Sequence, residues 1–133
     1  NWVKRGATTL WESFQPEGGR VLSLNHHFWG DISAWFYTYL AGIKINPMGR
    51  DVTNVDIAPL FPEKLRNVSA HYNTPNGRIT VVWKRTVENS VVLKITAAES
   101  LHGKILLPKG FAFENGTHET ELKSGEYKLN YAD

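Results

Sequence analysis

The period of apolar and polar residues changes once along the chain, near Asn46-Pro47. Upstream of this point, apolar and aromatic side chains recur at steps of three and four residues over 28–40. This spacing is typical of an amphipathic α-helix with a broad apolar face. We therefore predict a helix over residues 26–41, ended by Gly42.

Downstream of Pro47 the period is two residues, which is the side-chain period of a β-strand. The segments expected to form strands are 68–72, 79–84, 91–96, 104–107, 119–123 and 126–130. Turn residues separate them, notably at Thr74-Pro75-Asn76-Gly77, Glu88-Asn89-Ser90 and Pro108-Lys109-Gly110. About seven short strands without an intervening helical pattern predict an antiparallel β-sandwich.

The two patterns divide the chain into residues 1–46, which are loop and helix, and residues 47–133, which form the sandwich. The fold class is thus mainly β. The sandwich is long enough to bury a core of its own. A single helix buries its aromatic face only against the sandwich or against a neighbour from outside this chain. We therefore expect part of the face over 28–40 to be exposed, and the chain to self-associate through it.

Composition excludes several classes of protein. The 133 residues are 41% hydrophobic and 21% charged, which is ordinary for a globular domain and argues against a disordered chain. The net charge is +2 and the basic residues are scattered, so we expect no nucleic-acid and no membrane partner. The absence of Cys removes disulfides, thiolate metal sites and a cysteine nucleophile.

The first candidate for chemistry is the string Gly-Ala-Thr-Thr-Leu-Trp-Glu at residues 6–12. A carboxylate at Glu12 beside an aromatic wall at Trp11, on a loop with two threonine hydroxyls, suits a group held rigidly in a cleft. The alternative is a surface glutamate beside a core tryptophan. The motif alone does not exclude that alternative.

The second candidate is Ser-Leu-Asn-His-His at residues 23–27, where the predicted helix begins. Adjacent histidines project about 100° apart on a helix, so His26 and His27 do not form a metal pair as residues four apart would. His26 at a helix start has the chemistry to hydrogen-bond a ligand hydroxyl. A structural histidine beside a capping asparagine is the alternative. We expect no metal site and no cofactor in this chain.

Taken together, residues 6–12 and 23–26, with Gly30, Trp35 and the string Ala-Gly-Ile at 41–43, resemble the last turn of the catalytic barrel in bacterial α-L-rhamnosidases. These enzymes are the family 78 glycoside hydrolases. The segments 77–85, 106–108 and 124–127 are similar to the β-sandwich that ends them. The likeness covers nearly the whole chain.

The resemblance implies an inverting hydrolase on an (α/α)₆ barrel, acting on terminal α-L-rhamnosyl residues of a glycoside or polysaccharide. It implies that Glu12 is the general base, that Trp11 shapes the pocket and that His26 hydrogen-bonds a rhamnose hydroxyl. The family often has a tyrosine where this chain has His27, so no role is carried over there. The other site residues of the family lie upstream, so this chain is expected to be the inactive C-terminal part of a bacterial parent that is periplasmic or secreted.

Three other functions remain open from the residues alone. A non-catalytic carbohydrate-binding sandwich needs an exposed aromatic platform, for which Tyr72, Trp83 and Tyr127 are the candidates. Alternation places Trp83 on the same face as Ile79 and Val81, so we expect it inside. The end of another (α/α)₆ glycosidase and a purely structural interaction module are the remaining alternatives.

Overall fold

The computed structural model describes residues 2–12, 23–45, 48–86 and 90–131. The chain divides into two compact units, Asn1–Trp35 and Phe36–Asp133. The first contains the 3₁₀ helices η1 (Val3–Arg5) and η2 (His27–Gly30) and the short helix α1 (Asp31–Trp35). The second contains a π-helical turn, η3 (Phe36–Leu40), and the strands.

The expected helix is present, but it is not one regular α-helix. Helical structure runs from His27 to Leu40 in three successive geometries, namely 3₁₀, α and π. The π geometry is marked by the bond from the Ala41 amide to the Phe36 carbonyl, 3.0 Å long. A period of three to four residues does not distinguish these geometries, because all of them place apolar residues on one side.

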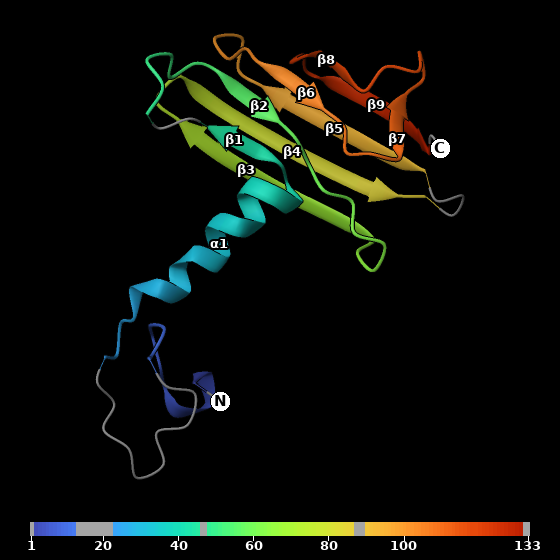
Figure 1. Cartoon of the computed structure of the whole chain (residues 1–133). Helices are drawn as coiled ribbons and strands as arrows, with labels where there is room; N and C mark the ends of the chain where they lie inside the picture. Colours follow the sequence, from blue (N-terminus) through green and yellow to red (C-terminus); the bar gives the residue numbers. More distant parts are fainter. Residues whose placement is uncertain (1, 13–22, 46–47, 87–89, 132–133) are drawn as a thin grey trace. The chain divides into compact units, whose positions relative to one another are not determined.

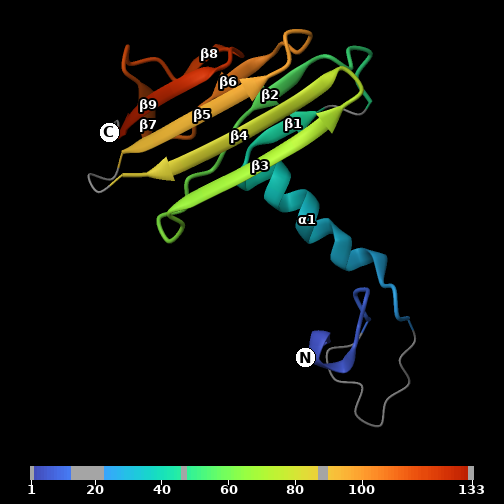
Figure 2. The ribbon, with the colours of Figure 1, turned by 180° about the vertical axis from the view of Figure 1, so that it is seen from behind.

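The described residues of the second unit form two sheets. The four-stranded sheet has the order β1-β2-β6-β8 and the five-stranded sheet has the order β3-β4-β5-β9-β7. The strands are β1 (Ile43–Ile45), β2 (Val55–Ile57), β3 (Asn67–Thr74), β4 (Gly77–Arg85), β5 (Val91–Ala97), β6 (Lys104–Leu106), β7 (Phe111–Phe113), β8 (Glu119–Glu121) and β9 (Gly125–Tyr131). The two sheets lie face to face, and Figures 1 and 2 show them from opposite sides.

The predicted β-sandwich is therefore confirmed, with two differences. Strands β1, β2 and β7 lie outside the segments that the alternation predicts, whereas the equally short β6 and β8 lie within them. Strand β2 also runs parallel to β6, with Ile57 opposite Ile105, so the sandwich is not antiparallel throughout. The turns at Pro75-Asn76 and at Lys109-Gly110 are present, whereas Glu88 and Asn89 lie outside the described residues.

The core of the sandwich contains the apolar positions of the alternating strands. Trp83 is fully buried, as its alternation with Lys84 predicts, and its ring meets Phe61 edge to face at 5.3 Å. The other fully buried large side chains are Pro59 and, from strands of both sheets, Val55, Ile57, Ile79, Val81, Val91, Leu93, Ile95, Ile105 and Leu129. Burial of these side chains supplies the main stabilisation of the fold.

Hydrogen bonds fasten the end of the helical run to the sandwich. The Trp83 indole donates to the Leu40 carbonyl at 2.8 Å, and the Leu60 amide donates to the Tyr39 carbonyl at 2.8 Å. Helix ends leave their last carbonyls without intrahelical partners. Here residues distant in the sequence supply those partners. Gly42 follows with φ 76°, a left-handed conformation that ends the helix as predicted.

Candidate active-site segment

The two motifs of the first unit are joined through their main chains. The Glu12 amide donates to the Ser23 carbonyl at 2.9 Å, and the His26 amide donates to the Leu10 carbonyl at 2.7 Å. The Thr9 hydroxyl also donates to the carbonyl of Leu24. These bonds run in an antiparallel sense, so residues 9–12 and 23–26 form one paired segment.

Glu12 and Trp11 both lie half-buried in this segment. The Arg5 guanidinium carbon is 6.0 Å from the centre of the Trp11 ring, which is the outer limit of a cation–π contact. Arg5 belongs to η1, which is closed by the bond from the Gly6 amide to the Val3 carbonyl at 3.1 Å. Helix η1 thus supports the tryptophan that precedes the carboxylate.

His26 immediately precedes η2, in an extended conformation with φ −88° and ψ 106°. It is half-buried, whereas His27 is exposed, and the two rings are 5.9 Å apart at 38°. The main-chain pairing brings His26 opposite Leu10, two residues before Glu12. The Glu12 carboxylate and the His26 imidazole therefore lie on adjacent segments whose main chains are bonded to each other.

Two aspartates in or near β2, Asp51 and Asp56, have structural partners. Asp51 Oδ1 accepts hydrogen bonds from the Thr53 amide at 3.0 Å and the Thr53 hydroxyl at 2.5 Å, an arrangement in which an aspartate caps a turn. Its Oδ2 lies 3.0 Å from His102 Nε2. The hydrogen bonds from Thr53, with a smaller contribution from His102, lower the pKa of Asp51 below its ordinary value of 3.8. Asp56 accepts from the Lys104 amide at 2.8 Å.

The aromatic candidates of the sandwich differ in accessibility. Trp83 is buried and offers no platform, whereas Tyr72 is exposed and meets Tyr37 edge to face at 6.3 Å. Tyr127 is half-buried beside Phe113, with ring centres 5.6 Å apart. The sequence does not single out Phe113, because all three residues of β7 are buried and show no alternation.

Two kinds of feature are absent from the described ranges. No helix among them is both long and apolar enough to cross a bilayer. No three or more His, Asp or Glu side chains in those ranges are grouped so that they could hold a metal ion.

Comparison with known proteins gives two family matches. Residues 45–121 match the bacterial α-L-rhamnosidase C-terminal domain, and residues 1–40 match the bacterial α-L-rhamnosidase six-hairpin glycosidase domain. A protein named α-L-rhamnosidase from Alteromonas sp. (strain LOR) is 29% identical over 96% of this chain and 15% of its own length. One of the same name from Formosa agariphila is 30% identical over 80% of this chain and 12% of its own length.

Two solved structures of similar fold are also named as α-L-rhamnosidases. The α-L-rhamnosidase from Dictyoglumus thermophilum aligns with a TM-score of 0.71 and 24% identity over 96% of this chain and 16% of its own. That from Streptomyces avermitilis, solved with L-rhamnose, aligns with a TM-score of 0.70 and 23% identity over 96% of this chain and 14% of its own. The chain thus spans about 15% of the length of these relatives. Because the C-terminal domain model matches more than half of its residues, the chain belongs to the bacterial α-L-rhamnosidase family.

Proposed function

We propose that this chain is the C-terminal part of an inverting α-L-rhamnosidase, which hydrolyses terminal α-L-rhamnosyl residues from glycosides or polysaccharides. The pairing of residues 10–12 with 23–26 carries the proposal, because it joins the two motifs that resemble the family's active site. The names of the relatives support the substrate class, as does the L-rhamnose bound to the Streptomyces avermitilis enzyme.

In this proposal Glu12 is the general base. An inverting glycosidase holds a general acid and a general base on opposite faces of the sugar, roughly 6.5–9.5 Å apart, so that a water fits between them. The Glu12 carboxylate accepts a proton from that water while the water oxygen attacks the anomeric carbon. Simultaneously the general acid, which is upstream of this chain, protonates the departing glycosidic oxygen.

Two neighbours complete this half of the site. Trp11 forms an apolar wall beside Glu12, and His26 hydrogen-bonds a hydroxyl of the rhamnose ring. The main-chain bonds of residues 10, 12 and 26 hold these side chains on one paired segment without using the side chains themselves.

The proposal also assigns the two parts of the chain. Residues 1–46 are the remnant of the (α/α)₆ barrel, and residues 47–133 are the C-terminal sandwich. The apolar side chains exposed on the helical run support a barrel that continues upstream, since soluble proteins rarely leave such a face uncovered.

The test is hydrolysis of a chromogenic α-L-rhamnoside by the full-length protein that contains this chain. Glu12→Gln keeps the size of the side chain but removes its ability to accept a proton. We expect kcat to fall by about 10²–10⁴-fold, with the protein still folded. Proton NMR of the first product should show the anomer opposite to that of the substrate.

A matched variant controls for loss of a carboxylate in general. Glu63 is exposed and lies between β2 and β3, so Glu63→Gln should retain full activity. The 133-residue chain alone should give no turnover. Full activity of Glu12→Gln, or Glu12-dependent turnover by the isolated chain, would contradict the proposal.

A further inference from the structure

The sandwich contains a cavity of about 280 Å³ at one edge of its two sheets. It is lined by Phe113, Glu114, Asn115, Thr117, Thr120, Glu126, Tyr127 and Lys128. These residues come from β7, the loop that follows it, β8 and β9. The volume suits a ligand of about one ring, near the lower end of small-molecule sites.

One wall of the cavity is aromatic. The rings of Phe113 and Tyr127 meet edge to face at 5.6 Å and 64°. The Tyr127 hydroxyl donates to the Lys123 carbonyl at 2.8 Å, which holds the ring in place. Partial burial raises the pKa of this phenol above its usual value of 10.0, so it stays neutral at physiological pH.

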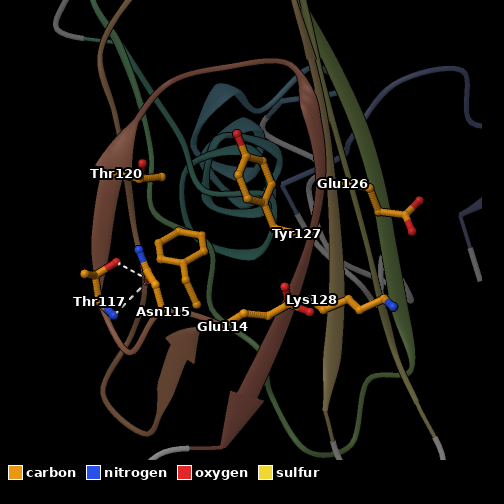
Figure 3. A pocket seen from close by; sticks show the side chains of 8 residues that line it. Glu114, Asn115, Thr117, Thr120, Glu126, Tyr127 and Lys128 are labelled. Carbon is orange, nitrogen blue, oxygen red and sulfur yellow. Dashed lines mark hydrogen bonds between the residues drawn. The ribbon is translucent and has the colours of Figure 1, made fainter.

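The loop side of the cavity offers neutral polar groups. Asn115 Oδ1 accepts hydrogen bonds from the Thr117 amide at 3.1 Å and the Thr117 hydroxyl at 2.8 Å, which fixes the loop. The Asn115 amide nitrogen is left to donate elsewhere, and Thr120 adds a hydroxyl that both donates and accepts. Figure 3 shows Asn115 and Thr120 on the same side of β9.

The edge of β9 adds main-chain groups. The amides of Phe111 and Phe113 donate to the carbonyls of Pro108 and Thr117, so they point away from β9. The main-chain groups of the intervening Ala112 therefore face β9, where Ala112 and Asn130 form the hydrogen-bonded pair. Alternate residues of a strand direct their main-chain groups to the same side. Those of Glu126 and Lys128 therefore face the same way as Asn130.

Strand β7 does not reach this part of the edge. Its last pair is Phe113 with Leu129, so no described strand covers the Glu126 and Lys128 main chains on that side. Their amides and carbonyls are therefore open to a ligand in the cavity. Their charged side chains extend to the opposite side of β9 from Thr120 (Figure 3).

We propose that this cavity is a binding site for one neutral sugar ring, separate from the residues proposed for catalysis. A sugar ring has an apolar C–H face that fits an aromatic wall and a rim of hydroxyls that both donate and accept hydrogen bonds. The cavity supplies both. The cavity is less suited to an anionic ligand, because the Glu114 carboxylate lies at its rim and the Lys128 ammonium is directed away from it.

A peptide strand fits this edge less well than a sugar. Strand addition uses a row of main-chain pairs, and the strands of folded proteins are usually three or more residues long. The open edge offers the groups of only Glu126 and Lys128 before β7 begins. The inference does not depend on the role of Glu12, because the cavity lies wholly within residues 113–128.

The experiment is NMR titration of the ¹⁵N-labelled 133-residue chain with L-rhamnose, D-galactose and D-glucose, and with glycerol as a non-ring control. We expect at least one sugar to give saturable amide shifts confined to residues 113–128. The dissociation constant should be in the millimolar range, ~1–10 mM, as expected for a ligand of this size. Glu12→Gln should bind equally well, which separates this inference from the proposed function.

Two variants with matched controls test the lining. Thr120→Val removes a hydroxyl at constant shape and should weaken binding about three- to tenfold, whereas Thr96→Val, on the exposed face of β5, should not. Tyr127→Leu should weaken binding by a similar factor, whereas Tyr127→Phe keeps the ring beside Phe113 and should bind more tightly than Tyr127→Leu. Thermal unfolding of each variant identifies one that fails to fold.

Three outcomes would overturn the proposal. The first is no saturable shift with any of the sugars, and the second is an equal response to glycerol. The third is a set of shifts at residues 125–128 that depends on protein concentration or on an added extended peptide, because that result would assign the edge to strand pairing.

Discussion

At the scale of single residues, main-chain bonds and side-chain roles are separate in the candidate site. The amides of Glu12 and His26 are used in pairing, and their side chains are not needed for it. This separation is why Glu12→Gln is expected to report on chemistry and not on folding. Asp51 differs, because its carboxylate itself accepts the hydrogen bonds from Thr53 that stabilise the turn.

The lowered pKa of Asp51 makes a prediction for pH dependence. Hydrogen bonds from Thr53 favour the ionised form in the folded state, so the contribution to stability is complete above the unfolded pKa of about 3.8 and is lost as the pH falls below it. Asp51→Asn keeps an acceptor for Thr53 but does not ionise. Thermal unfolding from neutral pH down to pH ~2.5 should show the gap between wild type and variant closing in the acid range.

Asp31→Asn is the matched control for this experiment. Asp31 is exposed in the first turn of α1, where removal of a charge should have little effect on unfolding of the sandwich. A gap between wild type and Asp51→Asn that stays constant over the whole pH range would contradict the role assigned to the Thr53 bonds.

At the scale of elements, the passage from helix to strand depends on close backbone contact. Gly42 lies between η3 and β1, and its carbonyl accepts from the Ala58 amide at 2.8 Å. A Cβ added at Gly42 would lie 2.1 Å from the Pro59 nitrogen, which is closer than atoms approach. Glycine is required there for two reasons, namely the positive φ and the absence of space.

Two alanine variants separate these reasons. Gly116 has φ 80°, close to the 76° of Gly42, but a Cβ there meets nothing within 4 Å. Gly116→Ala should therefore lower the free energy of unfolding by only ~1–2 kcal/mol, the cost of the left-handed conformation. Gly42→Ala adds a backbone clash and should cost several kcal/mol more. Urea unfolding followed by circular dichroism measures both, and equal losses would show that space at Gly42 is not limiting.

At the scale of the whole molecule, the helical run exposes more apolar surface than one helix normally leaves uncovered. Ile32 and Trp35 are exposed in the first unit, and Phe36, Tyr37 and Tyr39 are exposed in the second. In the proposed parent the upstream barrel covers this face. In the isolated chain it is available to a second copy.

We therefore predict that the isolated chain self-associates in a concentration-dependent way. Ile32 is 58% exposed, and Ile32→Lys should shift sedimentation velocity profiles toward the monomer. Val52 is 53% exposed but lies on the loop before β2, so Val52→Lys is the matched control and should have no effect. A wild-type chain that stays monomeric at all concentrations would contradict the prediction.

Local patterns in the sequence predicted the features that short segments form without distant partners. Alternation over five or more residues predicted the long strands and the inward side of Trp83, and three- and four-residue steps predicted the helical run. The strings at residues 6–12 and 23–26 indicated the family, but not that their main chains pair.

Features that depend on partners distant in the chain are visible only in the folded structure. The three-residue strands β1, β2 and β7 are held by their neighbours in the sheets, and the parallel pairing of β2 with β6 has no local signal. The cavity beside β9 exists because β7 ends at Phe113, before it reaches Tyr127. Such features follow from which main-chain groups find partners, and that is settled only when the whole chain has folded.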